Sequence, residues 1–171
     1  IRLSLVGSEM CIRDRYETYH GAAEGEPGRR LRVVAPMYAN LIHVMVREGA
    51  GIGSLSELRG KRVSVGSAGS GTEQTTRQLL ESQGLGYQDI QVEYLSFSES
   101  AAALKDGALD AAILSVGYPA AAVLEGTTTG GVGLLELSEA EVAEIVGMFP
   151  YYDAVSYTQL RAHETKANLV C

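Results

Sequence analysis

Apolar and polar residues along the chain fall into short blocks that predict strands and helices in alternation. Runs rich in β-branched and other apolar residues predict strands, and apolar residues at helical spacing between Ser, Gly or Pro predict helices. The predicted strands are residues 31–35, 41–46, 62–66, 90–95, 109–114 and 132–137. The predicted helices are residues 55–59, 71–83, 98–105, 119–124 and 138–146, the last opened by Ser138 with Glu141 as a capping box.

This order of elements predicts an α/β fold with a mostly parallel sheet and helices on both faces. In such sheets ligands bind beyond the carboxyl ends of the strands, where the connecting loops meet. The loops that follow Val65 and Leu114 should therefore lie at the same edge of the sheet. We take that edge as the candidate ligand site.

The first of these loops belongs to the segment VSVGSAGSGTE, residues 63–73. Its glycines let backbone N–H groups approach a ligand closely, and the helix that follows adds the positive end of its dipole. The hydroxyls of Ser67, Ser70 and Thr72 can donate to carboxylate or phosphate oxygens, although Ser70 or Thr72 could equally cap the helix. The segment therefore predicts an anion site formed by Ser67, Ala68, Gly69, Ser70, Gly71 and Thr72.

Three more specific anion-binding motifs do not fit the spacing. A Walker A loop needs Lys after its last glycine, but Thr72 follows Gly71. The dinucleotide fingerprint GxGxxG differs from the order GxxGxG found at Gly66, Gly69 and Gly71. A nucleophile elbow needs a glycine two residues before and two after a serine, and no serine of the loop has both. What remains is a general site for a small anion, with no cofactor indicated.

The second loop is SVGYPA, residues 115–120. Gly117 permits close approach, Tyr118 offers a flat ring with a hydroxyl, and Pro119 suits the first position of a helix. The alternative is an ordinary helix start with a buried tyrosine. The position of this loop beside the glycine-rich loop favours a binding role for Gly117, Tyr118 and Pro119.

Composition and charge narrow the classes of function. The 171 residues are 46% hydrophobic and 20% charged, with a net charge of −7 and scattered basic residues, which argues against binding nucleic acid. Cys11 and Cys171 belong to no metal-binding spacing, so no metal site is predicted. His43 is interpreted as a structural strand residue, and Asp106 and Asp110 as solvated turn residues. We therefore expect no catalytic residues, and a protein that is not an enzyme.

The two ends of the chain differ in character from its middle. Residues 4–15 and 155–171 resemble translated adapter or vector sequence, so we expect the segments 1–15 and 155–171 to be non-native. The alternative is a first strand at residues 1–6, where apolar and polar residues alternate, and a polar helix at residues 159–168. No secretory signal is visible at the start of the sequence.

Three segments together resemble a known family. SLSELRGKRVSVGSAGSGTE (54–73), LKDGALDAAILSVGYP (104–119) and MYANLIHVMV (37–46) resemble the TAXI branch of the solute-binding proteins that serve TRAP transporters. These are type II periplasmic binding proteins, and the likeness covers nearly all of residues 16–154. The resemblance implies a monomeric periplasmic or other extracytoplasmic protein. Its two α/β lobes would close over a small carboxylate solute, such as an amino acid or dicarboxylate, and deliver it to TRAP membrane permease subunits.

The resemblance also implies how the chain divides. Residues 16–60 would be the end of the first lobe and the crossing segment, and residues 61–150 the second α/β lobe of an incomplete two-lobe protein. Residues 67–72 and 117–119 would line the ligand cleft, with Tyr38 and Asn40 near the hinge. Two alternatives stay open: a phosphate-handling enzyme whose anion loop is residues 66–72, and a ligand-sensing regulatory domain of the same fold.

Overall fold

The computed structural model describes residues 2–6, 21, 24, 39–117, 120–128 and 130–155. The strands are β1 (Arg2–Val6), β2 (Ala39–Arg47), β3 (Arg62–Ser64), β4 (Gln91–Glu93), β5 (Ala111–Val116), β6 (Val132–Leu134) and β7 (Tyr152–Val155). The helices are α2 (Gly71–Ser82), α3 (Phe97–Lys105), α4 (Ala121–Thr128) and α5 (Glu139–Met148), with 3-10 turns η2 (Leu55–Leu58) and η3 (Tyr87–Asp89). Within these described residues, no helix has the length and apolar character needed to cross a membrane.

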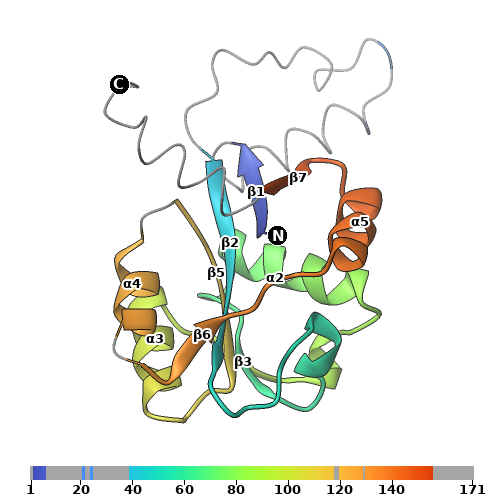
Figure 1. Ribbon diagram of the computed structural model, residues 1–171. Coiled ribbons are helices and arrows are strands. Elements are labelled where there is room, and N and C mark those ends of the chain that lie inside the picture. The colour runs from blue at the N-terminus through green and yellow to red at the C-terminus, as the bar shows by residue number, and fades with distance from the viewer. Residues whose placement is uncertain are drawn as a thin grey trace, which may run out of the picture.

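The described strands form one sheet in the order β4-β3-β5-β2-β1-β7, with β6 paired to the C-terminal half of β2 (Figure 1). The α/β class is confirmed, but the sheet is mixed rather than mostly parallel. β3 is parallel to β4 and β5, whereas β2 is antiparallel to β5, β6 and β1, and β1 is antiparallel to β7. Alternating strands and helices predict parallel pairing only for strands that crossover helices join, such as β3, β4 and β5. β2 runs in the opposite direction between β5 and β1, which makes its pairings antiparallel.

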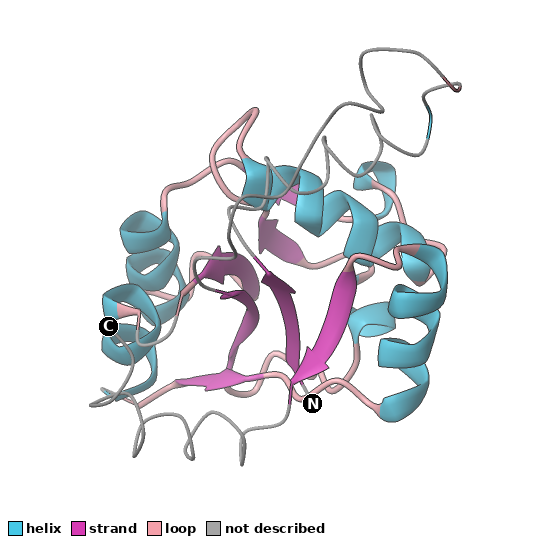
Figure 2. Cartoon of the chain, turned by 90° about the horizontal axis from the view of Figure 1, so that it is seen from above, coloured by secondary structure: helices cyan, strands magenta, loops and turns pink. Residues whose placement is uncertain are grey.

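Helices cover both faces of the sheet, as predicted. α2 and α5 pack on one face with η2, and α3 and α4 pack on the other (Figures 1 and 2). On β5, Ala111 and Ile113 belong to the core on the α2 side, whereas Ala112 and Leu114 belong to the core on the α3 side. A strand buried on both faces requires apolar residues at successive positions, which explains the continuous apolar run in the sequence.

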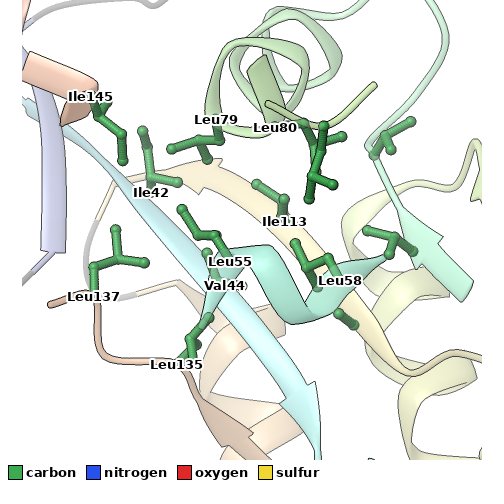
Figure 3. Packing of buried hydrophobic residues seen from close by; sticks show 14 of the residues in the cluster. Ile42, Val44, Leu55, Leu58, Leu79, Leu80, Ile113, Leu135, Leu137 and Ile145 are labelled. Atoms are coloured by element: carbon green, nitrogen blue, oxygen red, sulfur yellow. The ribbon is translucent and has the colours of Figure 1, made fainter. Parts of the chain in front are cut away.

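The larger core lies between the sheet and the helices α2 and α5 (Figure 3). It brings together strand, helix and turn residues that are far apart in the sequence. Its labelled members in Figure 3 are Ile42, Val44, Leu55, Leu58, Leu79, Leu80, Ile113, Leu135, Leu137 and Ile145. Burial of such side chains is the main favourable term in folding, and here it fixes α2 against β5.

The capping box predicted at the start of α5 is confirmed. The Oε2 atom of Glu141 accepts from the backbone N–H of Ser138 at 2.8 Å, and the Ser138 hydroxyl accepts from the Glu141 N–H at 3.3 Å. The other carboxylate oxygen accepts from the N–H of Leu55 at 2.8 Å. Burial acts to raise the pKa of Glu141, but hydrogen bonds from Leu55 and Ser138 bring this pKa below its ordinary value. The ionised carboxylate therefore links α5 to η2.

At the edge of the sheet where β5 begins, Asp110 connects three strands. One carboxylate oxygen accepts from Arg47 Nη2 at 2.7 Å and from Arg62 Nη2 at 2.9 Å, and the other accepts from Arg62 Nε at 3.1 Å. These bonds, those from Arg62 foremost, hold the pKa of Asp110 well below its usual range. The interpretation of Asp110 as a solvated turn residue is therefore wrong, because its side chain is only 13% exposed and ion-paired. We call Arg47, Arg62 and Asp110 the Asp110 cluster.

Some predicted features fall at the limits of the described residues. β1 pairs with β2 and β7, so the first strand of the alternative interpretation is present. The non-native origin of the segments 1–15 and 155–171, and the division into lobes, stay predictions. The strand expected at residues 31–35, the helix considered at 159–168, and the candidate residues Tyr38, Tyr118 and Pro119 lie outside the described residues.

Candidate ligand-binding site

The loops that follow β3, β4 and β5 emerge at one edge of the sheet, at the upper end in Figure 1. β3 is parallel to both neighbours, with Val63 level with Val92 of β4 and with Ala111 of β5. The carboxyl ends of the three strands therefore point the same way. The prediction that the two candidate loops lie at the same edge of the sheet is confirmed, and we call this edge the ligand edge.

β2 begins at the ligand edge. It is antiparallel to β5, and Leu41 pairs with Val116. Asn40 precedes Leu41 on β2 and Gly117 directly follows β5, so both candidate residues lie at this edge. Both are half-buried. The fold thus brings together two positions that are more than seventy residues apart in the sequence.

The loop of residues 66–70, here called the glycine loop, folds tightly against the start of α2. Gly66 has a φ of +89° and Gly69 a φ of +73°, a backbone conformation that glycine adopts readily. A Cβ atom on Gly66 would lie 2.9 Å from the Cβ of Thr72, whereas one on Gly69 would meet open space. Ser70 is the N-cap of α2, because its hydroxyl accepts from the N–H of Glu73 at 3.2 Å.

Glu73 places a carboxylate of the protein itself in the glycine loop. Its Oε2 atom accepts from the N–H of Gly69 at 2.6 Å, and its Oε1 atom from Arg77 Nη2 at 3.0 Å. The Arg77 guanidinium lies over the ring of Tyr87, 4.5 Å from its centroid. Burial and then the charge of Glu73 raise the pKa of Tyr87 to about 12, so this ring stays neutral. One donor of the predicted anion loop is therefore already used.

Further donors lie in the first turn of α2. The first N–H groups of any helix have no partner within the helix. Ser70 satisfies one of them, since its hydroxyl accepts from the N–H of Glu73, and the regular helical bonds begin with the N–H of Gln74, which donates to the Ser70 carbonyl. No hydrogen bond among the described residues uses the N–H groups of Gly71 and Thr72. These two N–H groups are therefore available to an anion at the start of α2.

The other candidate residues differ in exposure. Among the described candidate residues, the exposed ones are Ser67, Ala68 and Gly69. The half-buried ones are Ser70, Gly71, Asn40 and Gly117, and Thr72 is buried. His43 is fully buried on β2, opposite Leu114 of β5, which agrees with its interpretation as a structural residue. The described residues contain no group of three or more His, Cys, Asp and Glu that could hold a metal ion.

Sequence reasoning missed three residues of the ligand edge. Glu73 was available from its spacing, because residues four apart on a helix lie side by side and Arg77 follows at that distance. Tyr94, which is 48% exposed, follows β4 at this edge, but the predicted strand at residues 90–95 placed it inside the strand. Ser115 lies within β5, and no local pattern indicates that its hydroxyl has no partner among the described residues.

A family model places the chain among known proteins. The model of the NMT1-like family matches residues 8–159. Because this match covers most of the sequence, the chain belongs to the NMT1-like family.

Solved structures of periplasmic binding proteins are similar to parts of the chain. The periplasmic aliphatic sulphonate binding protein SsuA from Escherichia coli is 27% identical over 56% of this chain and 29% of its own, with a TM-score of 0.47. The alkanesulfonate-binding protein SsuA from Xanthomonas axonopodis pv. citri, bound to MOPS, is 17% identical over 75% of this chain and 63% of its own, with a TM-score of 0.46. An ancestral arginine-binding protein bound to arginine is 23% identical over 77% of this chain and 57% of its own, with a TM-score of 0.42. The chain thus spans less than two thirds of the length of each of these proteins.

Proposed function

We propose that the chain is part of an extracytoplasmic solute-binding protein that serves a TRAP-type transporter of the TAXI branch. The protein binds a small carboxylate solute, an amino acid or a dicarboxylate, and delivers it as a monomer to membrane permease subunits. The resemblance of residues 37–46, 54–73 and 104–119 to that branch supports this assignment.

One observation of the structure carries the proposal. The first turn of α2, where the N–H groups of Gly71 and Thr72 have no partner among the described residues, lies at the edge where β2 begins and β5 ends. N–H donors at the positive end of a helix suit a carboxylate, which accepts several hydrogen bonds. The glycines around this turn leave room for a ligand to approach the backbone. The ligand edge therefore supports binding of a small anion.

The test is a calorimetric titration of the full-length protein with L-glutamate, with succinate and with inorganic phosphate. We expect a carboxylate to bind, and Thr72→Ala to weaken its binding about tenfold through loss of a hydrogen bond to a charged group. Ser82→Ala is the matched control, because Ser82 lies at the other end of α2 and its hydroxyl donates to the Leu79 carbonyl at 2.8 Å. The control should bind like the wild type.

Two results would contradict the proposal. Binding of phosphate without binding of either carboxylate would favour the phosphate-handling alternative. Equal affinities of the wild type and Thr72→Ala would contradict the part of the proposal in which the Thr72 hydroxyl binds the solute, since this substitution leaves the backbone N–H groups of the turn in place.

A further inference from the structure

The hydroxyl of Ser115 is buried without a hydrogen-bond partner in the described part of the chain. Ser115 is 5% exposed, and no hydrogen bond to its Oγ is found among the described residues. A buried hydroxyl that loses its bonds to water and gains none in the protein costs free energy of folding. Because the unpaired hydroxyl does not stabilise the fold, the presence of a serine at this position needs another reason.

The side chain of Ser115 points toward the face of the sheet that α2 covers. Side chains alternate along a strand, and Ala111 and Ile113 of β5 belong to the core on the α2 side. Ser115 is two residues beyond Ile113, so its side chain lies on the same face of the sheet. It pairs with Ile42 of β2, which also belongs to this core.

The position of Ser115 along β5 matches the start of α2. Ser64, the last residue of β3, is level with Ala112, so Ser115 is three residues further on, at the level of the glycine loop. α2 follows that loop directly and contacts β5. The hydroxyl of Ser115 therefore lies beneath the first turn of α2, where Gly71 and Thr72 have unpartnered N–H groups.

A second buried serine at the same edge shows the ordinary arrangement. Ser64 of β3 is fully buried on the opposite face, and its Oγ lies 2.7 Å from the Oγ of Ser100 on α3. Ser100 in turn donates to the carbonyl of Ser96 at 2.8 Å, so Ser64 donates to Ser100. The buried hydroxyl of Ser64 is thus hydrogen-bonded on one face of the sheet, whereas the buried hydroxyl of Ser115, on the face of the proposed site, has no partner among the described residues.

We propose that Ser115 is a further ligand-binding residue, whose hydroxyl donates to the oxyanion group of the solute held by the N–H groups of Gly71 and Thr72. This inference rests on the proposed function. The solute's acid group would enter between β5 and the first turn of α2, and would thereby supply the partner that Ser115 lacks. A carboxylate and a sulfonate share the chemistry that this site requires.

The experiment compares Ser115→Ala and the near-isosteric Ser115→Cys with the wild-type full-length protein. Calorimetry with L-glutamate, succinate and methanesulfonate measures affinity, and thermal unfolding without ligand measures stability. We expect both variants to bind about tenfold more weakly, because each loses a hydrogen bond to a charged group. Ser115→Ala should match or exceed the wild-type melting temperature, because it removes an unpaired buried hydroxyl. A purely structural residue would not give this combination.

Ser64→Ala is the matched control: it should lower the melting temperature and leave affinity unchanged, because its hydroxyl is paired on the opposite face. If the wild type binds and both Ser115 variants bind equally well, the inference fails while the proposed function stands. A lower melting temperature of unliganded Ser115→Ala, with unchanged affinity, would likewise overturn it. If the wild type binds none of the three probes, the proposed function fails and the inference fails with it.

Discussion

At the edge of the sheet where β5 begins, Asp110 accepts hydrogen bonds from both Arg47 and Arg62. At the edge where β5 ends, Ser115 has no partner, and the N–H groups of Gly71 and Thr72 have none among the described residues. The two edges are formed largely by the same strands. One satisfies its polar groups within the protein, and the other leaves donors for a further molecule.

This difference separates stability from binding within one sheet. Buried polar groups that are fully paired hold the chain in one arrangement, whereas unpaired groups cost stability unless a ligand pairs them. Glu73 combines both properties: its carboxylate is hydrogen-bonded to Gly69 and Arg77, and it lies at the ligand edge. Substitutions at the edge where β5 begins should therefore lower stability without changing solute affinity, whereas substitutions at the ligand edge should change solute affinity.

Asp110→Asn should have the largest effect on stability. It removes the charge shared by Arg47 and Arg62, and we expect a loss of about 3 kcal/mol in the free energy of unfolding, at the low end for buried ion pairs because both arginines are partly exposed. Urea unfolding measures this loss, and solute affinity should not change.

The pH dependence sharpens the same prediction. The pKa of Asp110 is lowered in the folded protein, so its contribution is complete above the unfolded value of about 4 and is lost as the pH falls below it. The acid limb of the stability curve should be shallower in Asp110→Asn than in the wild type. Asp106→Asn, at an exposed position nearby, should leave the curve unchanged, and an equal effect of the two variants would show that the Asp110 cluster does not stabilise the fold.

Gly66→Ala should act at the ligand edge and affect both binding and stability. The new Cβ would take a positive φ and lie 2.9 Å from the Thr72 side chain, so we expect a loss of about 2 kcal/mol and weaker solute binding. Gly69→Ala also takes a positive φ, but its Cβ meets open space, and about 1 kcal/mol should be lost. Thermal unfolding and calorimetry of the two variants compare these effects. Equal losses would mean that the contact between Gly66 and Thr72 does not shape the loop.

Glu73→Gln should have the smallest effect on stability and an opposite effect on binding. The amide oxygen can still accept from Gly69, but the ion pair with Arg77 is lost, which costs less than about 1 kcal/mol because the Arg77 side chain is 61% exposed. Removing a negative charge beside the first turn of α2 should tighten carboxylate binding about threefold at low salt. Glu81→Gln, in the last turn of α2, is the control. Unchanged affinity in Glu73→Gln would separate Glu73 from the ligand edge.

Much of the fold was predictable because its signals are local. The alternation of strands and helices, the helix cap at Ser138 and the apolar run of β5 each depend on residues a few positions apart. The mixed sheet was not predictable in this way, because the direction of β2 depends on its neighbours β5 and β1. The role of Asp110 was missed for the same reason, since Arg47 and Arg62 reach it from other strands.

The candidate site also combines features that local sequence predicts with features that depend on distant residues. The glycine loop, the start of α2 and the loop that contains Gly117 were predictable from local sequence, because glycine and serine act on the backbone around them. The pairing of the start of β2 with the end of β5, the hydrogen bond from the Gly69 N–H to Glu73, and the burial of the Ser115 hydroxyl without a partner among the described residues depend on the tertiary structure. The physical reason is that strand direction and register place distant residues together, and these are set by the packing of the whole sheet rather than by any local pattern.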